Sequence, residues 1–229
     1  MEKKQYDLCR AILGRFHKAG ILDDIILVGS WCVYFYQDYF TGVPYLDQAT
    51  IKTRDIDFLI NQPSKIGREV NIPELLKDLG FIIDYKGRQG YIKLDHPELI
   101  VEFLVPEKGR GIDKPFPIPK LGINATALRF LGFLSANTIR VKVGDFRLTV
   151  PHPANFALHK LIIFQRRTRK EKAAKDMNIA IEVLKALVKK GEINIIKDVF
   201  SSIPGKWQAK IRTGLEKSRD KELASTLRL

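Results

Sequence analysis

Apolar and polar residues alternate along the chain with two different periods. In residues 3–19 the apolar side chains recur at helical spacing up to Gly20, which indicates a helix and its end. Short apolar runs bounded by turn-forming residues indicate strands. The predicted strands are 25–28, 54–61, 81–85, 91–94, 99–105, 138–143 and 146–150, and the predicted helices are 3–19, 31–40 and 71–79.

The pattern changes after Pro151. Residues 153–190 and 192–220 carry helical periodicity with many Lys and Arg residues and no strand alternation. Before that point, the segment 106–120 holds four prolines and two glycines, which indicates a loop. We therefore predict an α/β (α+β) fold with two domains, residues 1–150 around a small mixed β-sheet and residues 151–229 as a basic helical domain.

Charge and composition restrict the classes of protein to consider. The chain has 39 Lys and Arg residues against 26 Asp and Glu, a net charge of +13, which attracts polyanions but also suits a merely soluble basic surface. Cys9 and Cys32 are too few for a disulfide framework and lack zinc-site spacing. No apolar run approaches the roughly 18 residues of a membrane span, and the N-terminus lacks a secretory-signal pattern. We expect a cytoplasmic protein without a membrane partner.

Two aspartates interrupt the predicted strand 54–61. Asp55 and Asp57 are two residues apart, so their side chains project from the same face of the strand. Two carboxylates this close repel each other unless a divalent cation lies between them, and Mg²⁺ prefers carboxylate oxygen. The alternative is an edge strand with a solvated acidic face.

A single glutamate lies in the strand 99–105. Glu102 is the only polar residue among these seven, and an unpaired buried carboxylate costs several kcal/mol. A metal ion shared with Asp55 and Asp57 would stabilise it, and so would a salt bridge to one of the many Lys and Arg residues. Both readings remain open at this stage.

A Gly-Ser pair follows the first predicted strand. Gly29 allows the backbone to approach a ligand, and the Ser30 hydroxyl and the N–H groups of a helix start suit a phosphate. Strand, Gly-Ser, helix, a strand with Asp-x-Asp and a later strand with one more carboxylate together resemble the polymerase-beta-like nucleotidyltransferase superfamily. The resemblance covers about the first 105 residues. The spacing between Ser30 and Asp55 is long, which implies an insertion over 41–53.

The helical part carries a second resemblance. His159-Lys160-Leu161, Arg166-Arg167 and Lys175-Asp176 are similar to the helical region of bacterial nucleotidyltransferase-like proteins, including AbiEii-type toxins. The basic residues at 159, 160, 166 and 167 fall at i, i+7 spacing, which predicts a helix stripe that lines a polyanion groove or faces solvent.

The resemblance implies a nucleotidyltransferase core with a C-terminal helical domain. The implied activity is metal-dependent transfer of a nucleoside monophosphate from a nucleoside triphosphate to an acceptor hydroxyl, with RNA or another polyanion as a candidate acceptor. The implied site consists of the phosphate-binding residues Gly29, Ser30 and Lys160, and of Asp55, Asp57 and Glu102 as catalytic ligands of two Mg²⁺ or Mn²⁺ ions.

Two other classes of function fit the same residues. One is a non-catalytic nucleic-acid-binding or toxin–antitoxin partner protein that retains the fold. The other is a phosphohydrolase or nuclease that uses the same acidic cluster. Dependence on a nucleoside triphosphate separates a transferase from a nuclease, and RNA binding without consumption of nucleotide favours the binding protein.

Overall fold

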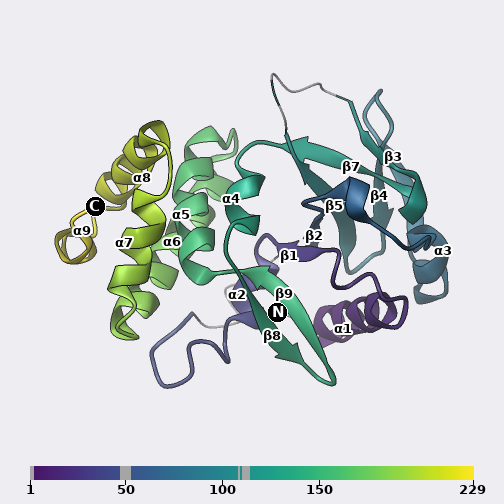
Figure 1. Cartoon of the computed structure of the whole chain (residues 1–229), viewed down its shortest axis with the longest axis horizontal. Coiled ribbons are helices and arrows are strands. Elements are labelled where there is room, and N and C mark those ends of the chain that lie inside the picture. Colours follow the sequence, from purple (N-terminus) through teal and green to yellow (C-terminus); the bar gives the residue numbers. More distant parts are fainter. Residues whose placement is uncertain (1–2, 47–52, 108, 110–113) are drawn as a thin grey trace. The chain divides into compact units, whose positions relative to one another are not determined.

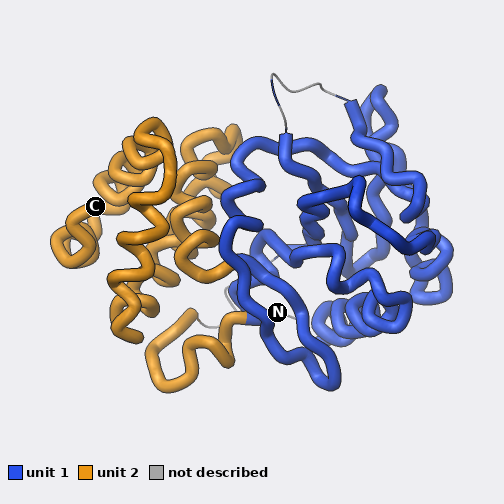
Figure 2. The backbone as a smooth tube through the Cα atoms, in the orientation of Figure 1, with its two compact units in different colours: residues 1–35, 48–151 blue, residues 36–47, 152–229 orange. Residues whose placement is uncertain are grey.

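The computed structural model describes residues 3–46, 53–107, 109 and 114–229. Contacts between Cα atoms divide the chain into two compact units, shown in blue and orange in Figure 2. The first unit comprises residues 1–35 and 48–151, and the second comprises residues 36–47 and 152–229.

The first unit is built around a mixed β-sheet with short helices (Figure 1). Its strands are β1 (Ile26–Val28), β2 (Asp55–Leu59), β3 (Ile82–Lys86), β4 (Tyr91–Asp95), β5 (Ile100–Pro106), β6 (Phe116–Ile118), β7 (Ile123–Leu128), β8 (Thr138–Val143) and β9 (Phe146–Pro151). Its helical segments are α1 (Lys3–Lys18), α2 (Trp31–Phe35), η2 (Pro63–Lys65), α3 (Ile72–Leu76), η3 (Lys77–Leu79), η4 (Pro119–Leu121) and α4 (Leu131–Ser135). The predicted fold class is confirmed.

The three strands that carry the predicted site lie side by side, as expected. The strand order is β1-β2-β5-β4-β3, with β7 pairing with β5 and β6 pairing with β7. The β1–β2 pair is antiparallel and the β2–β5 pair is parallel. The predicted hairpins β3–β4 and β8–β9 are both present.

The two faces of this sheet differ in what covers them. On one face Phe16 of α1 packs against Phe58 of β2 and Phe103 of β5, with ring centroids 5.2 Å and 6.3 Å apart. The apolar residues at helical spacing in the predicted helix 3–19 therefore form the buried stripe of α1. The helix ends shortly before Gly20, whose backbone is in the left-handed region (φ +71°). On the other face a small apolar cluster joins the sheet to α4 and consists of Val28, Leu59, Leu104, Leu131 and Leu134. Asp55 and Asp57 alternate with the buried residues of β2, so they lie on this second face.

Several predicted elements of the first unit require correction. The segment 106–120 is not wholly a loop, because β6 and η4 lie within it, and β7 and α4 follow where no element was predicted. The predicted helix 31–40 ends at Phe35. Beyond it the chain continues in turns, and Tyr36 packs edge-on against Phe156 within the second unit, with ring centroids 5.5 Å apart. Of the insertion expected at 41–53, residues 47–52 lie outside the described residues.

The second unit is helical after residue 152, as predicted. It contains α5 (Pro153–Ile163), η5 (Phe164–Arg166), α6 (Lys170–Lys189), α7 (Ile193–Ser201), α8 (Gly205–Ser218) and α9 (Lys221–Leu227). The central helix α5 packs against α6, α7 and α8 (Figure 1). The two long helical segments expected from periodicity are each interrupted, the second of them at Pro204, which cannot continue a helix. None of the described helices combines the length and apolar character that a bilayer crossing requires.

Candidate active site

The Gly29-Ser30 turn and Asp57 lie against each other. Val28 is opposite Asp57 in the antiparallel β1–β2 pair, so the turn that follows β1 begins beside this aspartate. Gly29 has φ +77°, and a Cβ atom added there would overlap Oδ2 of Asp57. Only glycine combines this backbone conformation with such a close approach of the carboxylate.

The turn contributes little helix dipole. The helix that follows, α2, has only five residues, so its aligned peptide dipoles are few. Any contact of this turn with a phosphate therefore rests on the Ser30 hydroxyl and the local backbone groups. Ser30 is half-buried, which leaves part of it accessible to a ligand.

Strand register brings Glu102 beside Asp57. In the parallel β2–β5 pair Asp57 is opposite Glu102 and Asp55 is opposite Ile100. Residues opposite each other in neighbouring strands lie on the same face of the sheet, about 5 Å apart. The three predicted carboxylates therefore occupy one face of two adjacent strands.

The side chain of Glu102 points to a cation on the next strand. Its Oε1 atom forms an ion pair with Nζ of Lys93 in β4, and both side chains are largely buried, at 18% and 29% exposure. Within the stretches that the structure describes, no three His, Cys, Asp or Glu side chains form a ready cluster of metal ligands. Of the two readings left open for Glu102, the salt bridge is present, and its role as a metal ligand stays a prediction.

Lys93 is a site residue that the sequence reasoning missed. It lies opposite Glu102 in the antiparallel β4–β5 pair, one position beyond the paired Leu94 and Val101. The alternation of Tyr91, Lys93 and Asp95 with apolar residues was a detectable signal that these side chains share a face. Which neighbour they meet depends on strand order, which the alternation does not contain.

Lys160 lies in the second unit and has a different environment from that expected. Its side chain is 5% exposed, and its Nζ donates to Oδ1 of Asp176 at 2.5 Å. The other carboxylate oxygen of Asp176 accepts a hydrogen bond from Nε of Arg167 at 2.8 Å. The proposed neutralisation of a triphosphate by Lys160 stays a prediction, while its contact with Asp176 gives it a structural role.

The predicted basic stripe on α5 is wrong. His159 and Lys160 are buried, at 7% and 4% exposure, and α5 ends at Ile163, so Arg166 and Arg167 do not continue the same helix. Burial and then the charge of Lys160 lower the pKa of His159 to about 3. This histidine is therefore neutral at physiological pH and does not contribute to an anion-binding surface.

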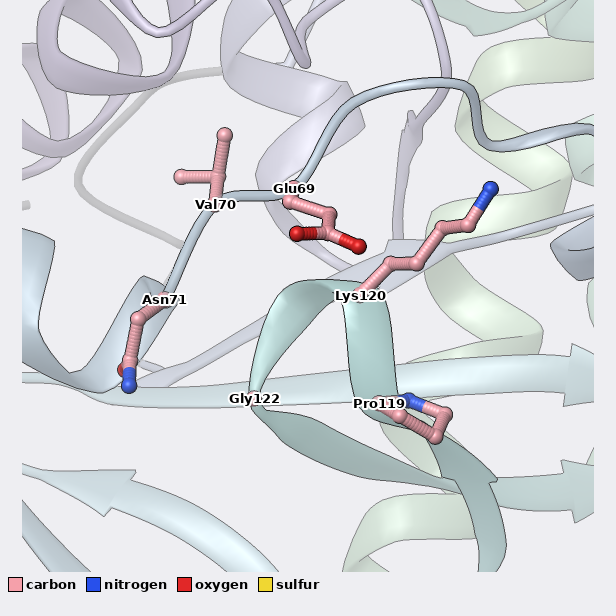
Figure 3. A pocket seen from close by; sticks show the side chains of 6 residues that line it. All are labelled: Glu69, Val70, Asn71, Pro119, Lys120 and Gly122. Atoms are coloured by element: carbon pink, nitrogen blue, oxygen red, sulfur yellow. The ribbon is translucent and has the colours of Figure 1, made fainter.

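A cavity of about 380 Å³ lies elsewhere in the first unit (Figure 3). It lies between the segment before α3 and the turn around η4, and its lining residues are Glu69, Val70, Asn71, Pro119, Lys120 and Gly122. Lys120 donates from Nζ to the carbonyl of Ile66 at 2.8 Å, and Asn71 caps α3 by accepting from the Glu74 amide at 3.1 Å. Since these polar groups serve the local fold and none is a predicted site residue, we assign no ligand to the cavity.

Comparison with known proteins supplies the family. A family model described as nucleotidyltransferase matches residues 8–203. The chain belongs to the nucleotidyltransferase family. The resemblance stated from Gly29, Ser30, Asp55, Asp57 and Glu102 is thus confirmed at the level of family, and members of this family typically use divalent metal ions.

The solved structures that resemble this chain have low sequence identity to it. The antibiotic-resistance factor ANT(2'')-Ia, in a complex with adenylyl-2''-tobramycin, is 10% identical, with a TM-score of 0.50 over 87% of this chain and 98% of that one. A solution structure of ANT(2'')-Ia gives a TM-score of 0.49 at 11% identity, covering 88% of this chain and 94% of that one. An antigenic nucleotidyltransferase-like protein from Paracoccidioides brasiliensis gives 0.49 at 14% identity, covering 96% of this chain and 92% of that one. No curated protein matches the chain in sequence.

The close packing of Gly29 against Asp57 leads to a prediction. A Gly29→Ala variant should lose at least about 1 kcal/mol of unfolding free energy, because alanine is strained at positive φ and its Cβ displaces the Asp57 carboxylate. Chemical denaturation measures this loss. Gly14→Ala in the interior of α1 is the matched control, since a Cβ there meets nothing within 4 Å. The free energy of unfolding of this control should rise by about 0.5–1 kcal/mol, because alanine is more favourable than glycine inside a helix. Equal stability of Gly29→Ala and the parent would contradict the packing described.

Proposed function

We propose that the chain transfers a nucleoside monophosphate from a nucleoside triphosphate to an acceptor hydroxyl. The observation that carries the proposal is the contact of the Gly29 turn with the Asp57 carboxylate, which itself lies in register with Glu102. The turn to which we assign phosphate binding therefore lies beside two carboxylates on one face of the sheet, and this arrangement supports the proposal. Family membership supports the reaction class.

The residues present fit a divalent cation. Asp55, Asp57 and Glu102 offer hard carboxylate oxygens from two adjacent strands, the donor type that Mg²⁺ and Mn²⁺ prefer. Two such ions would supply charge neutralisation at the triphosphate and activation of the acceptor hydroxyl. We assign Asp55 and Asp57 to both ions and Glu102 to the ion on the acceptor side.

The chain's own groups have separate tasks in this reaction. Ser30 and the Gly29 backbone orient the phosphates so that the acceptor oxygen lies in line with the α-phosphorus. The acceptor oxygen forms a bond to this phosphorus while the bond to the bridging oxygen breaks and pyrophosphate leaves. Glu102 takes the acceptor proton, directly or through water.

The direct test supplies each nucleoside triphosphate in turn. The parent chain is incubated with a triphosphate labelled at the α-phosphate, Mn²⁺ or Mg²⁺, and a total cell extract, and the labelled product is identified. Transfer of label with release of pyrophosphate is expected. Hydrolysis of nucleic acid without a triphosphate would indicate a nuclease, and RNA binding without nucleotide consumption would indicate a non-catalytic binding protein.

For the acceptor we propose RNA, on the basis of a basic surface in the second unit. Five of the seven residues from 166 to 172 are Lys or Arg, and residues 166–172 are exposed. They surround the start of α6, and its N-cap residue, Arg169, forms no side-chain capping hydrogen bond. Positive side chains at a helix N-terminus oppose the helix dipole, so a polyanion placed there relieves an unfavourable arrangement.

Removing three of these charges should weaken RNA binding. RNA affinity falls as salt rises, and each phosphate contact to a single strand contributes about 0.7 to the slope of log affinity against log salt concentration. In the triple variant Arg169→Gln/Lys170→Gln/Lys172→Gln this slope should therefore be less steep by about 2. Fluorescence anisotropy with labelled total RNA at several salt concentrations measures this. The control removes the same charge from α8 with Lys206→Gln/Lys210→Gln/Lys217→Gln. An equal decrease in the salt dependence of RNA affinity in both variants would mean that the net charge of the chain, and not this surface, determines RNA binding.

A further inference from the structure

Three acidic residues and one lysine form a charged row across the sheet. Asp57, Glu102 and Lys93 lie at neighbouring positions of β2, β5 and β4, and Asp84 of β3 is opposite Lys93. They share the face that carries the candidate active site. Asp84 forms its own ion pair with Lys86. Lys93 therefore lies between two acidic neighbours, one of which is already paired, and its ammonium contacts Glu102.

The Lys93–Glu102 contact has an electrostatic consequence for the site. Asp57 and Glu102 are adjacent, half-buried carboxylates, and their negative charges repel each other more strongly there than in water. A cation at Glu102 offsets this repulsion. Lys93 supplies one positive charge to Glu102 from the side of β5 away from Asp57, whereas a divalent ion shared by the carboxylates would supply two.

We propose that Lys93 is a built-in counter-ion that holds Glu102 until a divalent metal replaces it. This inference rests on the proposed function, because that function assigns Glu102 to the metal. Metal binding then has to break the Lys93–Glu102 ion pair, so Lys93 lowers the affinity of the free chain for metal while it stabilises the metal-free fold. Lys93 is a positioning residue, since it acts through Glu102.

Two substitutions of lysine by methionine test this. Methionine keeps the length of the aliphatic side chain and removes the charge, so Lys93→Met should bind Mn²⁺ at least about fivefold more tightly than the parent, the lower end of typical coupling between sites. Its thermal unfolding temperature in chelator should fall, and the rise on adding Mn²⁺ should be larger than for the parent. Lys86→Met is the matched control, because Lys86 pairs with Asp84 on the same hairpin and does not contact Glu102. The control should leave the Mn²⁺ affinity unchanged.

The measurements use the full chain without nucleotide, with Mn²⁺ as the only ligand. Electron paramagnetic resonance of free Mn²⁺ gives the affinity, and thermal unfolding with and without Mn²⁺ gives the stability. Lys93→Gln repeats the test if Lys93→Met does not fold. An affinity within twofold of the parent, including absence of binding in both, overturns the proposal.

Failure of this inference is distinguishable from failure of the proposed function. A Lys93→Met chain with tighter Mn²⁺ binding, in a protein that transfers no nucleotide, supports the counter-ion and rejects the transferase. Unchanged Mn²⁺ affinity, in a protein whose transfer activity requires Asp57, rejects the counter-ion and supports the transferase.

Discussion

Asp57→Asn should lower nucleotidyl transfer at least about 100-fold while leaving the fold intact. A carboxylate that holds a metal ion contributes several kcal/mol of transition-state stabilisation, and each 1.4 kcal/mol corresponds to a factor of ten in rate. Asparagine keeps the shape beside Gly29 and Glu102 but removes the charge. Because it also removes repulsion from Asp55 and Glu102, the metal-free variant should be as stable as the parent or more stable.

Steady-state transfer of labelled nucleotide and thermal unfolding in chelator measure the two effects. Asp23→Asn is the matched control, since Asp23 is an exposed carboxylate that pairs with Arg140 at 2.7 Å and lies outside the charged row. The control should transfer nucleotide at the parental rate. If Asp57→Asn transferred as well as the parent, the assignment of the carboxylates to the active site would be wrong.

Asp176→Asn should produce the largest loss of stability. The carboxylate of Asp176 is 7% exposed and neutralises the buried ammonium of Lys160, which has 5% exposure. Removing one partner of a buried pair leaves the other charge uncompensated and costs about 3–5 kcal/mol. Chemical denaturation at neutral pH measures the loss.

The pKa of Asp176 fixes the pH range of this contribution. Burial by itself raises the pKa of Asp176, but the charges and hydrogen bonds of Lys160 and Arg167 outweigh it, so the pKa lies below its ordinary value of 3.8. A carboxylate with a lowered pKa stabilises the fold above that ordinary value and loses the contribution as the pH falls through the folded pKa. The contribution is therefore fully present at neutral pH.

Two further variants separate the ion pair from other effects of the Asp176 substitution. Arg167→Gln should lower the free energy of unfolding by less than about 1 kcal/mol, because the Arg167 side chain is 42% exposed and solvent screens its ion pair. The double variant Lys160→Met/Asp176→Leu should recover most of the loss, since it leaves no buried charge unpaired. A loss below about 1 kcal/mol for Asp176→Asn would contradict the buried pair. In folded Lys160→Met, a raised KM for the triphosphate would support the phosphate-binding role predicted from sequence.

The elements predicted best were those with short-range patterns. Asp55, Ile56 and Asp57 alternate with a period of two, so the sequence placed the aspartates on one face and the isoleucine on the other, and the structure has that arrangement. The helical spacing from Cys9 to Phe16 likewise identified the buried stripe of α1. Such patterns follow from the geometry of the element itself.

The elements missed were those that depend on distant partners. The strand β7 pairs with β5 over Leu104–Pro106 and with β6; its sequence alternates only from Ile123 to Ala127, and two of its apolar residues are alanines, which have a low β-propensity. The helix α2 ends at Phe35, and the next residue, Tyr36, packs against Phe156, more than 100 residues later. The local pattern contains neither of these long-range contacts, and tertiary context can override local preference.

The sequence by itself determined which residues are candidates for the chemistry: the Gly29 turn, the paired aspartates and a lone glutamate in an apolar strand. Carboxylates in apolar strands or next to each other cost folding free energy, so the sequence alone marks them as unusual. Only the tertiary structure decided that Glu102 faces Lys93 and that Lys160 faces Asp176. A charged side chain chooses its partner by proximity after the strands and helices have packed, and that proximity is set by strand order and helix packing across the whole chain.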